Sequence, residues 1–520
     1  MHYLSIIALI FSPLVAAALL FSPFFKDNEV RIRRFSKGFA SLHFLYSILF
    51  LVFFNPMQNA LSGAVSGAAS DGVAYLQEIK LFGSSWIQSM GVKMDFGMDG
   101  IALLMVLLTS FIFLLALIAS KSNIKVKHKF YYSMMFMLQT AVLGVFCARD
   151  MFLFFMFWEF ELVPMYFLIG QWGCGKCKES AMKFVLYTFL GSLSMLMGIL
   201  LLHFYNFASY GNLTADFSQI SISSPQFPMF MQLLVSVLLL IGFAVKLPIV
   251  PFHTWLPDAH TDAPTPVSMI LAAILLKMGA FGIIRFNMQL LPEAFKLLVP
   301  VLAALALVNI IYTAMVAYAQ TDLKKLVAYS SISNMGIVLL GLCTLNLVGF
   351  SGAVFQMVSH GVISAGLFML VGIIYLRTKT RDMIELGGLG HVMPRLMGFG
   401  LILSLASVGL PLLMGFVGEF LVFLGAFNSS IDDLNTPIKI YSILAILVLI
   451  FSAAYIFKLL HKTFFGNILE QWSGVKDITN HEFVVLFSIV LVVGFFGIFP
   501  MAILNIVQPI LTSILQYLQI

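Results

Sequence analysis

Two lysines lie inside long apolar segments of this sequence. Lys246 and Lys277 fall within residues 240–286, where a loop rich in Pro, His and Asp joins two apolar stretches. A lysine at the centre of a membrane helix costs about 2.5–3.5 kcal/mol on insertion scales, so it needs a partner or water. Because ionisable groups kept at such a cost usually serve transport, the two lysines predict a site that moves protons or other ions.

Two acids lie in another apolar segment, MFLFFMFWEFELVPMYFLIG. Glu159 is its ninth residue and falls near mid-depth of a span, whereas Glu161 lies about 200° further round a helix and so faces elsewhere. The alternative for either acid is a protonated, hydrogen-bonded carboxyl with a structural role. We predict Glu159 as a functional acid and retain Glu161 as a second candidate.

The second half of the chain carries a matching pair of groups. His360 is central in VFQMVSHGVISAGLFMLVG, and Glu419 follows Pro411 in LPLLMGFVGEFLVFLGAF. No second histidine falls at the same depth in a facing span, so haem ligation is not expected. As ionisable groups inside apolar spans, both are further candidate functional residues.

Other polar clusters do not predict a metal or cofactor site. The loop residues His253, Asp258, His260 and Asp262 match no metal-ligand spacing, and a hydrogen-bonded loop that caps broken helix ends explains them better. Cys174 and Cys177 form a C-x-x-C, but no second pair completes a zinc or iron–sulfur site, so we expect four free thiols. We expect no cofactor, no metal and no redox centre in this chain.

The composition is that of a polytopic membrane protein. Of 520 residues, 61% are hydrophobic and 10% charged, and the mean hydropathy is +1.01. About fourteen apolar runs are long enough to cross a bilayer as helices. They centre near Ile10, Tyr46, Leu108, Leu138, Phe155, Met195, Leu238, Ile274, Leu305, Ile337, Ala365, Leu405, Leu447 and Leu491.

Prolines predict two broken helices in an inverted repeat. Hydropathy puts Lys246 near a helix end, but Pro248 and Pro251 predict a break, with the helix resuming beyond them and the lysine deeper in the membrane. The segment VGLPL around Pro411 echoes VKLPI around Pro248, an odd number of spans away, as in transporter repeats. We predict an all-α fold with three N-terminal helices and a loop (1–128), two inverted five-helix repeats (129–290 and 291–466) and a last span with a short tail (467–520).

The basic loops set the orientation. They fall on one side of a fourteen-span topology, which the positive-inside rule makes the cytoplasmic side. These residues are Lys26, Arg31, Arg33, Arg34, Lys121, Lys125, Lys127, Lys129, Lys176, Lys178, Lys183, Lys324 and Lys325. Both termini and the long loop 56–99 then lie on the opposite side, and residues 5–21 are expected to remain as a span. The net charge of +6 reflects this topology and not a nucleic-acid surface.

Soluble enzymatic modules are not expected. The longest polar stretches, 56–99 and 466–481, are too short for a core of their own. The sequence has no Gly-rich dinucleotide fingerprint after a strand and no phosphate-binding GK[ST] loop. An ion gradient or partner subunits must therefore drive the protein.

Several segments resemble one family closely. They are WEFELVPMYFLIGQWG, VKLPIVPFHTWLPDAHTDAPTPVSMILAAILLKMG, LKKLVAYSSISNMGIVLLG, QMVSHGVISAGLFMLVG and GFVGEF. Over roughly residues 95–465 the chain resembles the antiporter-like M subunit of respiratory complex I, called subunit 4 in mitochondria and the D subunit in cyanobacteria. The LVPMYF wording points to the M subunit rather than to its L and N siblings.

The resemblance implies proton pumping coupled to quinone reduction by other subunits, which take electrons from NADH or ferredoxin. By position, Glu159 resembles the glutamate that pairs with a lysine, Lys246 that lysine and Lys277 the connecting lysine. His360 and Glu419 resemble the central histidine and the terminal acid. The implied neighbours are L-type and N-type subunits, with the lipid of a bacterial inner membrane or an equivalent membrane around them.

Two departures and three alternatives accompany this resemblance. Asn334 stands where the family usually has His, and an amide cannot accept and release a proton. Leu412, Leu413 and Met414 follow Pro411, where small polar residues are usual, which lowers the expected hydration of that break. The alternatives are a D-type subunit of a multisubunit Na⁺/H⁺ antiporter, a subunit of a membrane-bound hydrogenase, and a non-transporting membrane scaffold.

Overall fold

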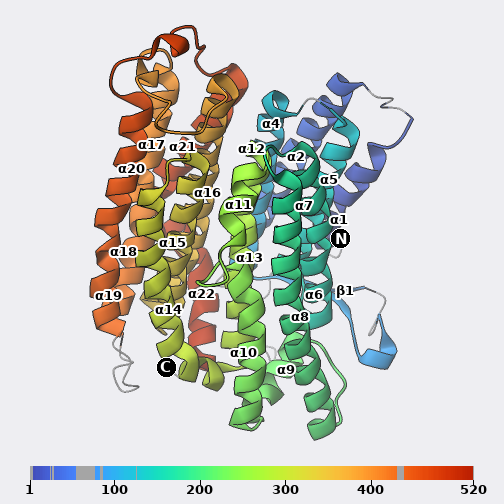
Figure 1. The fold of residues 1–520 in the computed structure, drawn as a ribbon. Coiled ribbons are helices and arrows are strands. Elements are labelled where there is room, and N and C mark those ends of the chain that lie inside the picture. Colours follow the sequence, from blue (N-terminus) through green and yellow to red (C-terminus); the bar gives the residue numbers. More distant parts are fainter. Residues whose placement is uncertain are drawn as a thin grey trace.

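A computed structural model describes residues 4–23, 25, 28–53, 77–81, 86–124, 126–429 and 438–518. In this part of the chain twelve helical segments are long and apolar enough to cross a membrane, and they form one upright bundle (Figure 1). They are α2 (Glu29–Phe53), α4 (Gly100–Asn123), α5 (His128–Cys147), α6 with α7 (Met151–Phe160 and Leu162–Trp172), α8 (Cys177–Tyr210), α10 (Met229–Lys246), α12 with α13 (Thr265–Ile270 and Leu276–Gly282), α14 (Pro292–Ala319), α15 (Leu323–Cys343), α16 (Leu347–Thr378), α19 with α20 (Ile438–Ile446 and Val448–Phe464) and α21 (Asn480–Ile498).

Four shorter apolar helices complete the bundle. They are α1 (Leu4–Leu19), α17 (Pro394–Val408), α18 (Met414–Phe427) and α22 (Met501–Tyr517). With α1 as one span and α17–α18 as the halves of another, every predicted span centre falls in a helical segment, which confirms the helical membrane fold. Helix α22 is additional, because the sequence analysis predicts only a short tail there. Lys26, Lys125 and residues 56–76 and 82–85 of the long loop lie outside the described residues.

A small hairpin departs from the all-α prediction. Strands β1 (Gln77–Leu81) and β2 (Met94–Met98) pair antiparallel, with Gln77 opposite Met98 and Leu81 opposite Met94. Strand β2 leads directly into Asp99, whose side chain accepts a hydrogen bond from Ala102 N at 2.9 Å and so caps α4. The hairpin thus fixes where the first buried span begins.

The first predicted break is present. Helix α10 ends at Lys246, and helix resumes only at α11 (Trp255–Asp262). Protein groups satisfy the freed backbone: Trp255 Nε1 donates to Val245 O at 2.9 Å, and Val250 N donates to Asn309 Oδ1 at 2.9 Å. Non-helical backbone at membrane depth is tolerated only with such cover, so the break is a fixed feature of the fold.

The second predicted break separates α17 from α18. Gly409 (φ +83°) ends α17 in the left-handed region, which suits a residue without a side chain, and Pro411 follows. Leu412 is 70% exposed in this chain. Side chains are thus exposed at the second break, as those of Pro251, Phe252 and Thr254 are at the first.

Close helix contact places α13 against the end of α10. A Cβ added to Gly279 would lie 2.7 Å from Leu247 N and 2.9 Å from Phe243 O, which leaves no room for a side chain. Small residues allow backbones in membrane bundles to approach in this way. Gly279 thus brings the span that carries Lys277 beside the helix that carries Lys246.

Candidate functional site

The first ion pair of the site joins Lys246 to Glu161. The Lys246 ammonium contacts Glu161 Oε1, and the two side chains are 1% and 0% exposed. The predicted partner, Glu159, interacts with Lys246 electrostatically and does not make this contact. Pro164 cannot donate to Phe160 O, so α6 ends at Phe160 and Glu161 lies in the turn before α7, where its carboxyl points inward. Glu161 itself keeps helical backbone angles (φ −69°, ψ −23°), so it faces away from Glu159, as a continuous helix also predicts.

Glu159 lies on the outer side of the same segment. It is partly buried next to the exposed side chains of Met156 and Val163, and its Oε1 has no hydrogen-bond partner in the described part of the chain. Its carboxyl still interacts electrostatically with Lys246. Lys246 therefore has two acids within its influence, one in contact and one at the surface.

Aromatic rings surround the Lys246 ammonium. The rings of Trp158 and Phe184 each have their centroid 5.4 Å from Lys246 Nζ. An ammonium over a ring face is stabilised by cation–π attraction, most strongly where water is excluded. This surrounding offsets part of the cost of burying the lysine.

The second link joins Lys277 to His360. Lys277 Nζ lies 2.7 Å from His360 Nδ1, and it also donates to Ala272 O at 2.6 Å. Ala272 belongs to a π-helical segment, Leu271–Leu275, one of two such segments that flank α13. A π-helical turn disturbs the regular hydrogen-bond ladder, and here the lysine bonds to one of its carbonyls. The predicted neighbourhood of these two residues is present.

An amide pair occupies the region around Asn334. Gln356 Nε2 donates to Asn334 Oδ1 at 2.9 Å, and Asn334 Nδ2 donates to Ser330 O at 3.0 Å. Gln356 is 2% exposed, and its Oε1 has no partner among the described residues. Sequence analysis missed Gln356, although its place one helical turn before His360 could have indicated it.

Glu419 is buried beside the second break. A Cβ on Gly409 would lie 2.6 Å from Glu419 Oε2, so the carboxyl packs against the chain where α17 ends. On the other side, Gly418 packs so closely on Gln356 that a Cβ there would collide with Gln356 Oε1. Within the described residues no direct hydrogen bond joins Glu419 to His360, or Lys246 to Lys277. The site therefore consists of two bonded pairs and one separate acid.

His260 is a second residue that the sequence analysis missed. The predicted loop is wrong for this residue, because Asp258, His260 and Asp262 lie on helix α11, where the two aspartates accept hydrogen bonds from Lys183 and Ser180 at 2.6 Å each. The His260 ring, in contrast, is 0% exposed and stacks on Phe368 with centroids 4.3 Å apart, and neither nitrogen has a partner in the described chain. A buried imidazole without partners is the sort of group that ordered water satisfies.

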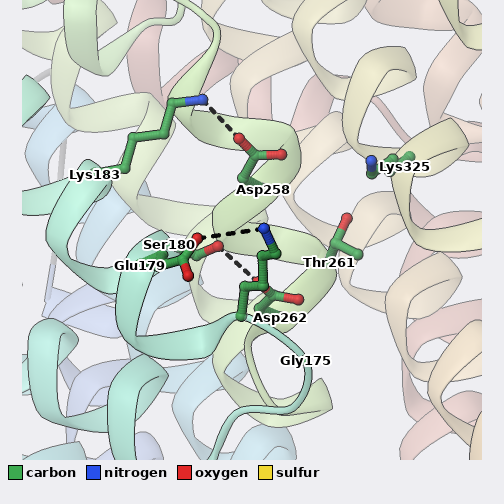
Figure 2. Close-up of a pocket in the computed structure, with 9 residues that line it drawn as sticks. Gly175, Glu179, Ser180, Lys183, Asp258, Thr261, Asp262 and Lys325 are labelled. Carbon is green, nitrogen blue, oxygen red and sulfur yellow. Dashed lines mark hydrogen bonds and ion pairs between the residues drawn. The ribbon is translucent and has the colours of Figure 1, made fainter.

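A polar cavity of about 490 Å³ opens at the basic end of α8. Figure 2 shows Lys183 and Asp258 pointing toward one another, Ser180 bonded to Asp262, and Lys325 on the opposite wall. The cavity lies beside α11, the helix that also carries His260. It gives the polar groups of that region contact with water from the basic end.

A charged cluster lies at the other end of the bundle. The Arg285 guanidinium contacts the Asp99 carboxylate, and both side chains are buried. Nearby, Asp150 caps α6 and accepts hydrogen bonds from Phe152 N and Lys93 N at 2.9 Å each. Burial raises the pKa of Asp150 to about 6, and the Asp216 carboxylate adds to that, although backbone N–H groups oppose it.

Asp150 is expected to make stability depend on pH. Because its folded pKa lies above the ordinary value of 3.8, its contribution is favourable at low pH and is lost as the pH rises toward about 6, by up to about 3 kcal/mol. Thermal midpoints of the purified assembly at pH 5 and pH 7 measure this. Asp150→Asn keeps a cap oxygen and should flatten the difference; an unchanged difference would contradict the assignment.

Comparisons with known proteins identify the family of this chain. A sequence model described as NADH:quinone oxidoreductase/Mrp antiporter, transmembrane, matches residues 148–437. NAD(P)H-quinone oxidoreductase chain 4 2 of Thermosynechococcus vestitus is 41% identical over 418 residues, which cover 80% of this chain and 77% of the relative. NADH-quinone oxidoreductase subunit M of Rickettsia typhi is 38% identical over 423 residues, with 81% and 83% covered.

Solved structures extend the similarity to nearly the whole chain. A chain of respiratory complex I from Thermus thermophilus with bound NADH has a TM-score of 0.84 and 29% identity, with 99% of both chains covered. A chain of the Mrp complex from Dietzia sp. shares the fold, with a TM-score of 0.78 at 17% identity and 100% of both chains covered. The chain therefore belongs to the NADH:quinone oxidoreductase/Mrp antiporter membrane-subunit family, on the branch of chain 4 and subunit M.

Proposed function

We propose that this chain is the M-type, proton-translocating subunit in the membrane arm of an NADH-quinone oxidoreductase. The observation that carries the proposal is the buried Lys277–His360 contact, which joins a lysine of the first half to a histidine of the second. Both groups can gain and lose a proton, and they lie in spans enclosed by protein. Oxidation of the electron donor and reduction of quinone take place in other subunits.

The proposed path begins at Lys246. A change of charge in a neighbouring subunit alters the balance between Lys246 and its two acids, because an opposite charge nearby favours the ammonium form. The released proton moves through water to Lys277, then to His360, and finally to Glu419 beside the second break. Asn334 takes no proton itself, so the step past it uses water.

The outer surfaces suggest two neighbours in the assembly. Glu159 lies at mid-depth on an otherwise apolar face, where lipid alone would leave a carboxyl unsatisfied. On the opposite half, Leu410 and Leu412 expose the second break, and open backbone at this depth also needs protein cover. We assign one L-type or N-type subunit to each face.

The orientation in the membrane follows from the position of the basic loops. The C-terminus lies at the end of the molecule that carries α9 (Phe217–Ser223), away from the basic loops (Figure 1). We therefore place both termini on the non-cytoplasmic side of a bacterial inner membrane or an equivalent energy-transducing membrane.

Redox-driven acidification of inverted membrane vesicles tests the function. With NADH or reduced ferredoxin as donor, Lys246→Ala should lower acidification several-fold in an assembly that still contains every subunit, since the first proton carrier is lost. Lys476→Ala, which removes an exposed lysine, is the matched control. Full acidification with Lys246→Ala would overturn the proposal.

The same assay distinguishes the roles of the two acids. Glu161→Gln removes the contact partner of Lys246, whereas Glu159→Gln removes the surface acid. Glu161→Gln should lower acidification in any assembly that contains the variant. Glu159→Gln should lower it only in an assembly where the charge of Glu159 acts on a neighbouring subunit.

A further inference from the structure

The C-x-x-C loop between α7 and α8 holds two thiols in a tight turn. Gly175 has φ +68°, and a Cβ on Gly173 would lie 2.7 Å from Cys177 Cβ, so the chain folds back on itself here. Both thiols are free and partly exposed, whereas Cys147 and Cys343 are fully buried. The proton path uses none of these four.

An arginine from the other half of the molecule lies beside the first thiol. Arg381 Nη1 is 3.7 Å from Cys174 Sγ, and the same guanidinium bonds to Thr261 O and pairs with Asp322 at 3.3 Å. A positive neighbour stabilises the negative charge on an attacking sulfur, which is how reactive cysteines are distinguished from inert ones. Cys177 is the first residue of α8, where the helix dipole acts in the same direction.

The residues between the two thiols form a wall of the polar cavity. Gly175 and Lys176 line the cavity of about 490 Å³, together with Lys183 and Lys325 (Figure 2). The lining carries both signs of charge, since Lys183 pairs with Asp258 at 2.6 Å and Lys176 with Glu179 at 3.6 Å, and the volume is within the range of ligand pockets. The cavity thus offers access to the loop from the basic side.

We propose that Cys174 is a modification site for a small disulfide of the glutathione class, which carries both ammonium and carboxylate groups, with Cys177 as the resolving thiol. The Cys174 thiolate attacks one sulfur of the disulfide, an S–S bond breaks, and one thiolate leaves and takes up a proton. The Cys177 thiolate then attacks Cys174 Sγ and expels the second thiolate. Two cysteine thiols are oxidised to one disulfide, and one external disulfide is reduced to two thiols.

The modification reaches the fold through Arg381. Once Cys174 is in a disulfide, its sulfur no longer carries the charge that the guanidinium favours, and the loop must shift to meet Cys177. Cys174 N donates to Asp262 O at 2.9 Å, so this shift also moves the end of α11. The redox state of the thiols therefore acts on the wall of the cavity.

The test uses glutathione disulfide on the purified assembly, with mass spectrometry of this chain. Native protein should lose two hydrogens across Cys174 and Cys177, and Cys177→Ser should instead retain one glutathionyl group on Cys174. Cys174 should react at least roughly tenfold faster than Cys147, which is the buried control. Cys174→Ser should abolish both products.

A second comparison tests whether the disulfide enters through the cavity. Lys176→Glu should slow the reaction with glutathione disulfide but not the reaction with neutral hydroxyethyl disulfide, because only the first carries charged groups that the cavity lining can pair. The proposal is overturned if no adduct accumulates in Cys177→Ser, or if Cys174 reacts no faster than Cys147. Equal effects of Lys176→Glu on both disulfides would exclude the cavity as the entry site.

Discussion

Replacing Lys277 by Met is expected to reduce redox-driven proton translocation by roughly tenfold or more, because the link between the two halves loses the titratable group that contacts His360. Methionine has a similar length and no charge, so packing around α13 should persist. Acidification of inverted vesicles and quinone reduction, measured on the same preparation, give the number of protons moved per electron.

Two variants control this expectation. Lys277→Arg keeps a positive charge that cannot be released, so it should resemble Met if proton transfer is the function and native protein if the charge is only structural. Lys476→Met, at an exposed position, should have no effect. Native proton translocation by the Met variant would remove Lys277 from the path.

Replacing Arg285 by Met is expected to destabilise the subunit by roughly 3–5 kcal/mol, the usual cost of leaving a buried charge without its partner. Asp99 is fully buried and also caps α4, so its unpaired carboxylate would stand at the start of a core span. The amount of this chain in the purified assembly and the thermal midpoint of the assembly measure the loss.

The double variant Asp99→Asn/Arg285→Met separates pairing from packing. Asparagine still caps α4 but carries no charge, so the double variant should recover a large part of the stability lost in Arg285→Met. If the double variant is no more stable than the single one, the loss comes from the packing of Arg285 against Phe281 and not from the ion pair.

The sequence predicted the spans well because their signal is long and simple. A run of about 20 apolar residues has one stable form in a bilayer, and the prolines at 248 and 411 locate the two breaks. It predicted that Glu159 and Glu161 face different sides of the helix, but it could not predict which side meets Lys246, since that depends on how distant helices pack against this one.

The sequence analysis missed other functional residues for a different reason. His260 and Gln356 are ordinary polar residues in the sequence. In the described part of the chain they are distinguished by buried atoms without a hydrogen-bond partner, the two ring nitrogens of His260 and Gln356 Oε1. Burial of a given side chain depends on helices far away in the chain, such as α16, whose Phe368 covers His260. The hairpin of β1 and β2 was missed because its strands are short and adjoin a long polar loop.

The span Thr265–Met288 is enclosed on all sides by protein, including by α16, which is made later. During synthesis it therefore enters the membrane before part of its cover exists, while it carries Lys277 and Arg285. Each of these costs about 2.5–3.5 kcal/mol in lipid, so earlier helices or an insertion factor must shelter the span until α14, α15 and α16 follow. A chain halted before α14 should accordingly fail to retain this helix in the membrane. Membrane insertion during synthesis, as well as proton transfer, therefore limits where a lysine can lie in this span.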